Sequence, residues 1–365
     1  MLDLLVAVAF ALFLAYHALR IVVTLRRTTR VAGRSLQGIR VDAPGSGNWV
    51  FPRVTFLVAG WNAKHDIRPF LESFYSLGSI DRQLVICIGG PDGGYADALA
   101  MSSSDVVVLE QVAGMGKQGA LRAGLPHADG EWIYLTDVDS RLSPECVTAM
   151  MFALSEGGAE CVTGGMSPLM EQRQEAFVCA QWGIERYGQI RAGDYVAGIL
   201  GANTLLKRSA VETTGSFSAA APSGTDYTLA KQLVAAGFAI KHVKNAEIET
   251  EFSHYLRTYI KRRSRWLRNV VTLGRRYGCY REVRSVYLTI ALSFLYPALL
   301  LAGVAWHFLW SVFCLLFLHS ILNRTRYCAA AGIPVRLMGI TKTFIGDAAA
   351  GILAAVGAAR GSTKW

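Results

Sequence analysis

The stretch Trp132-Ile-Tyr-Leu-Thr-Asp-Val-Asp-Ser140 has the pattern of a short apolar strand that ends in two aspartates. Helical stretches alternate with further apolar runs of strand length, at residues 54–58, 84–88 and 106–109. This alternation predicts an α/β fold with a mainly parallel sheet and helices on both faces. Ligands of such sheets bind beyond the carboxyl ends of the strands, where Asp92, Asp137 and Asp139 fall.

Asp137 and Asp139 are two residues apart at the end of a predicted strand, so both side chains can point into one cleft. Two carboxylates with few other ligands nearby suit a hard cation, and we expect Mg²⁺ or Mn²⁺ there. Such an ion, bound to a nucleotide diphosphate, would neutralise the charge on the leaving group. The pair alone leaves an alternative open, which is two solvated acids in a surface turn.

A glycine-rich segment, Gly114-Met-Gly-Lys-Gln-Gly-Ala-Leu121, leads into a predicted helix. Its backbone amides and Lys117 can approach a diphosphate. The segment is not a Walker loop, because no Ser or Thr follows the lysine at the required place. Judged by this segment alone, an ordinary turn is the better interpretation.

Asp226 precedes an amphipathic helix that runs from Tyr227 to a glycine stop at Gly237, so this carboxylate stands at a helix N-terminus. Asp is a common N-cap residue, which gives one role for this side chain. A base that takes the proton of an acceptor hydroxyl is the other role, and the two do not exclude each other.

Arg262, Arg265 and Trp266 stand at i, i+3 and i+4 and therefore share one helix face. Guanidinium groups on that face can bind phosphate oxygens, while the indole covers a sugar or a lipid. The alternative is a solvated basic face beside lipid headgroups, to which the neighbouring Lys261, Arg263 and Arg268 contribute.

The chain of 365 residues is only 18% charged and has a mean hydropathy of +0.30, which predicts that part of it lies in lipid. Residues 4–23 form an apolar run interrupted only by Arg20 and long enough for one N-terminal span. Residues 286–322 contain no Asp, Glu, Lys or Arg and predict two short spans that turn near Trp306-His307. Residues 343–359 carry Asp347 and fit a third span or an interfacial helix, and we favour the span.

The net charge of +10 is concentrated at residues 20–40 and 257–284, both beside predicted spans. Anionic lipid headgroups are therefore the expected partner, and nucleic acid is not. The basic residues follow the first apolar run, which argues against a cleaved signal peptide and predicts an integral membrane protein with its catalytic domain on the cytoplasmic face. The seven cysteines show no C-x-x-C spacing, and their odd number argues against a disulfide framework.

From about Arg53 to Arg268 the sequence resembles the membrane-bound inverting glycosyltransferases of family 2, which have a GT-A fold. Within that family it most resembles the ceramide glucosyltransferase group. The motifs that carry the resemblance occur in the family's order, at Val58-Ala-Gly-Trp-Asn62, Gly114–Leu121, Asp137-Val138-Asp139, Gly198–Arg208, Thr225-Asp226-Tyr227 and Arg262-Arg-Ser-Arg265-Trp266. The resemblance implies a GT-A catalytic domain with N-terminal and C-terminal transmembrane helices.

The resemblance also implies a role for each site residue. Asp92 would help to hold the uridine, and Lys117 would approach the diphosphate. Asp137 and Asp139 would bind the metal diphosphate, and Asp226 would be the base. The remaining three, Arg262, Arg265 and Trp266, would close over donor and acceptor.

Three departures from the family's motifs bear on donor and acceptor contacts more than on the reaction type. The usual Pro and Glu of the first loop are Ala59 and Ala63 here. Gly89 or Gly90 stands where the family has an acid, and Thr225 replaces the Glu before the base.

The predicted regions are a membrane anchor at 1–30, a cytosolic GT-A domain at 50–250, basic interfacial helices at 251–285 and a transmembrane region at 286–365. The expected reaction is transfer of a hexose, first of all glucose from UDP-glucose, to the hydroxyl of a lipid such as ceramide, with inversion. A processive polysaccharide synthase is one alternative, although three or four spans are too few to enclose a channel. A non-catalytic scaffold that binds nucleotide sugars or lipid is the other, and the retained carboxylates argue against it.

Overall fold

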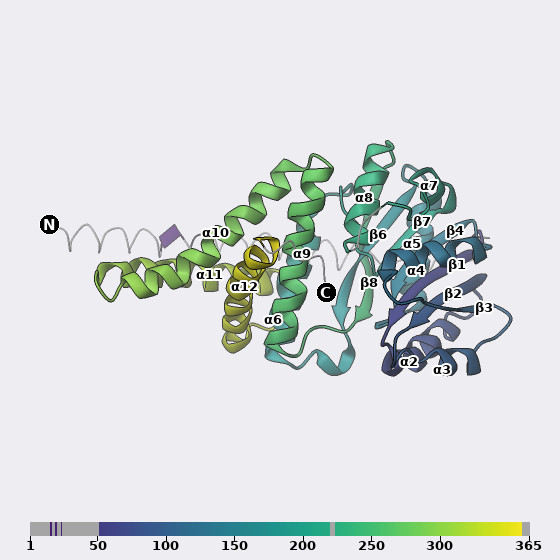
Figure 1. Ribbon diagram of the computed structural model, residues 1–365, viewed down its shortest axis with the longest axis horizontal. Coiled ribbons are helices and arrows are strands. Elements are labelled where there is room, and N and C mark those ends of the chain that lie inside the picture. Colours follow the sequence, from purple (N-terminus) through teal and green to yellow (C-terminus); the bar gives the residue numbers. More distant parts are fainter. Residues whose placement is uncertain (1–14, 17–18, 20–22, 24–50, 220–222, 360–365) are drawn as a thin grey trace.

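The computed structural model describes residues 15–16, 19, 23, 51–219 and 223–359 (Figure 1). The N-terminal span predicted within residues 1–30 therefore lies outside the described residues, apart from a few isolated helical positions. All seven cysteines are free thiols.

One sheet of eight strands forms the centre of the body. The strands are β1 (Val54–Trp61), β2 (Arg82–Gly89), β3 (Val106–Glu110), β4 (Trp132–Asp137), β5 (Ser140–Arg141), β6 (Cys161–Pro168), β7 (Thr204–Lys207) and β8 (Ile240–Thr250). Their order is β3-β2-β1-β4-β7-β6-β8-β5. Strands β1 to β4 are mutually parallel, as predicted. The other half is mixed, because β7 runs antiparallel to both of its neighbours and β5 runs antiparallel to β8.

Helices cover both faces of the sheet. They are α2 (Lys64–Tyr75), α3 (Tyr95–Ala100), α4 (Gly116–Gly124), α5 (Pro144–Ser155), α6 (Ala176–Arg191), α7 (Arg208–Thr213) and α8 (Thr225–Ala235), with short 3₁₀ turns η1 (Leu125–His127) and η2 (Met170–Gln172). Successive side chains of a strand point to opposite faces. Phe56 and Tyr134 therefore stack on one face, with ring centroids 4.9 Å apart, while Leu57 packs with Leu121 of α4 and Leu229 of α8 on the other. The predicted α/β fold is confirmed.

Four long helices follow the sheet, α9 (Leu256–Arg276), α10 (Tyr280–Ala302), α11 (Phe308–Ala330) and α12 (Leu337–Ala359). Residues 280–302, 308–330 and 337–358 are each long and apolar enough to cross a membrane. The chain turns between α10 and α11 at residues 303–307, where the sequence predicts a turn. Helices α10 and α11 project away from the sheet, and α9 and α12 lie between them and the body (Figure 1).

Asp347 of α12 joins three of these helices. Its carboxylate accepts a hydrogen bond from the Tyr259 hydroxyl of α9 at 2.8 Å. It also pairs with Arg263 of α9 at 3.2 Å and with Arg324 of α11 at 2.8 Å, and its side chain is only 19% exposed. An ionisable residue within an apolar helix needs such partners. The network therefore holds α9 against α11 and α12.

Replacing Asp347 by Asn is expected to destabilise the protein by about 3 kcal/mol, because two partly buried guanidinium groups lose their counter-charge. Thermal unfolding of the purified protein in detergent measures the effect. Asp194→Asn is the matched control, because Asp194 also pairs with a cation, Lys244 at 3.0 Å, but is 78% exposed and should leave the midpoint almost unchanged. Equal midpoints for the two variants would contradict a role of this network in holding the helices together.

Candidate active site

The two aspartates of the D-x-D motif lie where two parts of the sheet meet. Asp137 is the last residue of β4, and Asp139 lies between β4 and β5. Strand β5 pairs with the end of β8, and the Thr250 hydroxyl there donates to Asp139 Oδ1 at 3.5 Å. Val138 is buried between the two acids, while both carboxylates act on the ammonium of Lys117.

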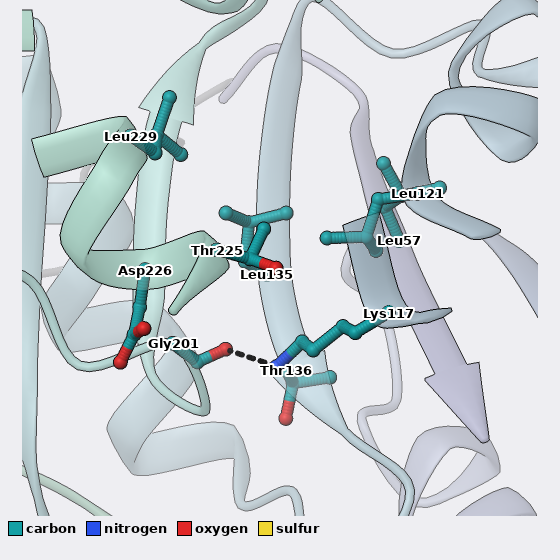
Figure 2. A pocket seen from close by; sticks show the side chains of 9 residues that line it. All are labelled: Leu57, Lys117, Leu121, Leu135, Thr136, Gly201, Thr225, Asp226 and Leu229. Atoms are coloured by element: carbon teal, nitrogen blue, oxygen red, sulfur yellow. Dashed lines mark hydrogen bonds between the residues drawn. The ribbon is translucent and has the colours of Figure 1, made fainter. Parts of the chain in front are cut away.

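Lys117 is surrounded by carboxylates. It lies in the first turn of α4, and its ammonium group pairs with Asp137 Oδ1 and donates to the Gly201 carbonyl at 3.5 Å (Figure 2). Burial opposes the charge on this ammonium, but Asp137, Asp226 and Asp139 outweigh it and raise the pKa of Lys117. The lysine therefore connects the D-x-D pair with the proposed base.

The pKa of the Asp139 carboxyl group is strongly shifted. Burial, followed by the nearby charge of Asp137, raises the pKa of Asp139 to about 7, although Arg262 and Lys117 act in the opposite direction. Two carboxylates that repel each other in this way favour the binding of a cation. Within the described residues no group of three or more His, Cys, Asp or Glu side chains forms a metal cluster. A divalent ion would therefore need phosphate oxygens and water to complete its shell, which is how Mg²⁺ is commonly held.

Asp226 is the second residue of α8 and not its N-cap. The cap position belongs to Gly224, whose φ of 77° suits glycine, so the capping role that the sequence suggested is wrong. The Asp226 carboxylate makes no hydrogen bond or ion pair closer than 4 Å with any other residue that the structure describes. A Cβ placed on Gly201 would lie 3.0 Å from the Asp226 Cβ and 3.5 Å from Lys117 Nζ. Glycine at position 201 thus lets the carboxylate approach the lysine.

A small cavity lies beside Lys117 and Asp226, with Leu57, Leu121, Leu135 and Leu229 in its wall (Figure 2). Its volume of about 10 Å³ has room for about one water molecule. The cavity is therefore the floor of the site and does not hold a sugar.

The R-x-x-R-W motif lies on α9. Arg262 is close enough to Asp139 to act on its carboxyl group. Burial and Arg262 lower the pKa of Arg265, while Asp226 and Asp137 oppose this effect. Both arginines therefore lie in the field of the carboxylate cluster. The Trp266 ring is 48% exposed and lies under the guanidinium of Arg263, 4.9 Å from its centroid.

Asp92 lies apart from the lysine and its carboxylates. It follows β2, where its N–H donates to Asn62 Oδ1 at 3.3 Å and its carbonyl accepts from the Lys64 N–H at 3.0 Å. Strand β2 is two positions from β4 in the sheet, so the two strand ends are separated by about 10 Å. That separation is suitable for a nucleoside at Asp92 with its phosphates near Asp137.

Trp61 belongs to the Val58–Asn62 motif, but the sequence analysis gave its side chain no role of its own. It ends β1 and is 46% exposed, and a Cβ placed on Gly89 would lie 2.9 Å from its ring. An exposed indole thus lies over a glycine on the same sheet edge as Asp92. The signal in the sequence was an aromatic residue directly after an apolar strand. Thr136 was also missed, and its buried hydroxyl has no hydrogen-bond partner in the part of the chain that the structure describes.

Comparison with protein families matches the model of the glycosyltransferase like family 2 to residues 52–269. The chain belongs to this family. The prediction of a glycosyltransferase is thereby confirmed, while membership of the ceramide glucosyltransferase group stays a prediction. Comparison with curated proteins finds no match for this glycosyltransferase.

Many solved structures are similar to this glycosyltransferase, and two of them are compared below. One is the mannosyltransferase PcManGT from Pyrobaculum calidifontis in complex with GDP-Man and Mn²⁺, with 17% identity, coverage of 89% of this chain and 97% of that one, and a TM-score of 0.48. The other is TarS 1–349 from S. aureus, with 11% identity, coverage of 60% of this chain and 64% of that one, and a TM-score of 0.42.

Replacing Lys117 by Met in this glycosyltransferase is expected to raise the pKa of Asp139 above its value of about 7, because a cation that favours the ionised carboxylate is removed. At neutral pH the variant should therefore carry more protonated Asp139 than the native protein. The carboxylic-acid band in infrared difference spectra, assigned with Asp139→Asn, measures it. Lys207→Met is the control, because Lys207 pairs with Trp132 at the other end of β4 from Asp137. An equal effect of both variants would contradict the arrangement.

Proposed function

We propose that this glycosyltransferase moves a hexose from a nucleotide diphosphate sugar to the hydroxyl group of a lipid, with inversion at the anomeric carbon. One observation carries the proposal. The Asp226 carboxylate has no hydrogen-bond partner among the described residues, yet it lies in the same cluster as Lys117 and the D-x-D pair. A free acceptor for a proton thus stands beside a place for a diphosphate.

The donor is proposed to lie along the carboxyl ends of β2, β1 and β4. Its nucleoside would rest on the Trp61 indole next to Asp92, since aromatic faces stack on planar rings. Its phosphates would reach Lys117, Arg262 and Arg265, whose charges suit phosphate oxygens. Because the family motifs resemble those of UDP-glucose enzymes, UDP-glucose is the first candidate.

A divalent cation, Mg²⁺ or Mn²⁺, is proposed at Asp137 and Asp139. The mutual repulsion of the two carboxylates supports this, and phosphate oxygens and water would complete the shell. When bound, such an ion supplies positive charge to the diphosphate as it leaves.

In the proposed reaction, Asp226 takes the proton of the acceptor hydroxyl while the oxygen forms a bond to the anomeric carbon. The bond from that carbon to the diphosphate oxygen breaks, and its electron pair stays on the nucleoside diphosphate. Lys117 and Arg265 stabilise the negative charge that develops there. Attack and departure take place on opposite sides of the sugar, and the configuration is therefore inverted.

The acceptor is proposed to be a membrane lipid, with ceramide as the first candidate, that reaches the site beside α9. Three apolar helices of spanning length follow α9, and two of them, α10 and α12, pack on it, which supports this. In this proposal residues 1–30 anchor the chain and 50–250 form the catalytic domain on the cytoplasmic face. Residues 251–285 lie at the membrane surface, and 286–365 cross the bilayer.

Asp226→Asn is expected to lower transfer by about 100- to 10,000-fold, because the hydroxyl loses its base, and to leave donor binding almost unchanged. Asp139→Asn should instead remove the part of donor binding that depends on Mn²⁺, since a ligand of the cation is lost. Steady-state transfer assays together with calorimetric titration of UDP-glucose, with and without Mn²⁺, separate the two effects. Full transfer by Asp226→Asn would refute the assigned base.

The product is expected to partition into organic solvent and to disappear when EDTA removes the cation. Detergent-solubilised protein is incubated with a panel of radiolabelled UDP- and GDP-sugars and either ceramide or total lipid extract, followed by mass analysis of new lipids. Label in an aqueous polymer would identify a polysaccharide synthase instead, and the absence of turnover with every donor would favour a binding scaffold.

A further inference from the structure

Glu282 connects the helix of the proposed base to the first candidate membrane helix. It lies in the first turn of α10, and each of its carboxylate oxygens binds a side chain of α8. The Tyr227 hydroxyl donates to Oε2 at 2.6 Å, and Lys231 Nζ donates to Oε1 at 2.6 Å. Lys231 also donates to the Ala197 carbonyl at 2.9 Å, in the segment that leads to Gly201.

Burial makes this pairing strong. Lys231 is only 7% exposed, while Glu282 is 42% exposed, and a buried ammonium without a partner would be costly. Tyr227 and Lys231 are four residues apart and lie on one face of α8, and the ammonium lies 4.8 Å from the Tyr227 ring centroid. Burial and the hydrogen bond to Glu282 raise the pKa of the Tyr227 phenol, so it remains a donor at neutral and moderately basic pH.

Helix α9 also contacts the first turn of α8, on either side of the base. Before Asp226, the Ser223 hydroxyl donates to Asn269 Oδ1. After it, a Cβ placed on Gly274 would lie 3.0 Å from the Tyr227 hydroxyl, so only glycine leaves room for the phenol there. The Asp226 carboxylate thus has no hydrogen-bond partner among the described residues, while Ser223 before it and Tyr227 after it are held by hydrogen bonds.

The apolar contacts of α8 do not determine its position along its own axis. Leu229 and Leu233 pack on the sheet in an apolar cluster, and apolar contacts are non-directional. Charge-assisted hydrogen bonds are directional, and those of α8 lead to Glu282 and, from Lys231, to the Ala197 carbonyl of the body. The helix that carries Glu282 therefore contributes, together with the body, to where the turn of Asp226 lies relative to Lys117.

We propose that Glu282 is a positioning residue for transfer, which holds the Asp226 carboxylate at the correct place through Tyr227 and Lys231. The inference rests on the proposed role of Asp226 as the base. Its consequence is that a lipid acceptor meets a base whose position is set by a membrane helix, not by the catalytic domain alone.

The test uses Glu282→Gln, Tyr227→Phe and the double variant Lys231→Met/Glu282→Gln in the full chain, reconstituted in nanodiscs. Each is expected to lower kcat by about 10- to 100-fold, because a displacement of about 1 Å of a reacting group has effects of this size. The KM for the donor and the Kd for UDP-glucose should stay within about two-fold. Since Tyr227→Phe and the double variant leave no buried ammonium unpaired, they report on position even if Glu282→Gln folds poorly.

The matched control is Glu156→Gln. Glu156 forms a similar short pair with Lys241, at 2.7 Å, on the body of the protein, and its loss should leave kcat unchanged. A combined Tyr227→Phe/Glu282→Gln variant should be no slower than the slower single variant, since both act through one contact. Glu282→Asp, which keeps the charge, should recover part of the rate.

Two results would overturn the inference. One is a native kcat in both Tyr227→Phe and Lys231→Met/Glu282→Gln. The other is a fall of kcat that is matched by equal losses in donor affinity and thermal stability, as a purely structural contact would produce. Asp226→Asn is measured beside them, and full activity of that variant would refute the base itself, whatever Glu282 does.

Discussion

The placement of one ammonium group among three carboxylates is the constraint on which the site depends. Lys117 pairs with Asp137 and feels the charges of Asp139 and Asp226. These acids come from the end of β4, the following loop and the first turn of α8, so their approach brings together distant parts of the chain. Without a cation between them they would repel one another. A lysine in the first turn of α4 therefore makes this convergence possible.

A second set of charges determines how the C-terminal helices meet the catalytic body. Asp347 holds α9 to α11 and α12, and Glu282 holds α8 to α10. Apolar contacts are non-directional, so they alone define the positions of these helices weakly. Ion pairs and hydrogen bonds with defined partners supply the missing direction. The helix with Arg262 and Arg265 and the helix with Asp226 are each tied to the apolar bundle in this way.

Local patterns were sufficient to predict the first half of the sheet and the loops that carry the site. Each of its parallel strands is an apolar run in the sequence. Asp92 follows β2, and the D-x-D pair lies at the end of β4. The direction of β7 could not be predicted, because strand direction depends on tertiary contacts. The start of α8 was placed too late, because glycine at 224 adopts a φ of 77° and lets the helix begin before Asp226. Contacts such as that between Tyr227 and Glu282 join residues far apart in sequence, and no periodicity marks them.

The charges of the site come from both the sheet domain and α9, so the site depends on contact between them. Three cationic side chains, Lys117, Arg262 and Arg265, act on the carboxylates of the site, and the two arginines come from α9. In the proposed function an entering diphosphate adds negative charge beside these carboxylates, which a divalent ion at Asp137 and Asp139 would offset. If α9 moved away, the carboxylates would lose Arg262 and Arg265 and repel one another more strongly. In the proposed function, donor binding and the attachment of α9 to the candidate membrane helices are therefore parts of one electrostatic arrangement.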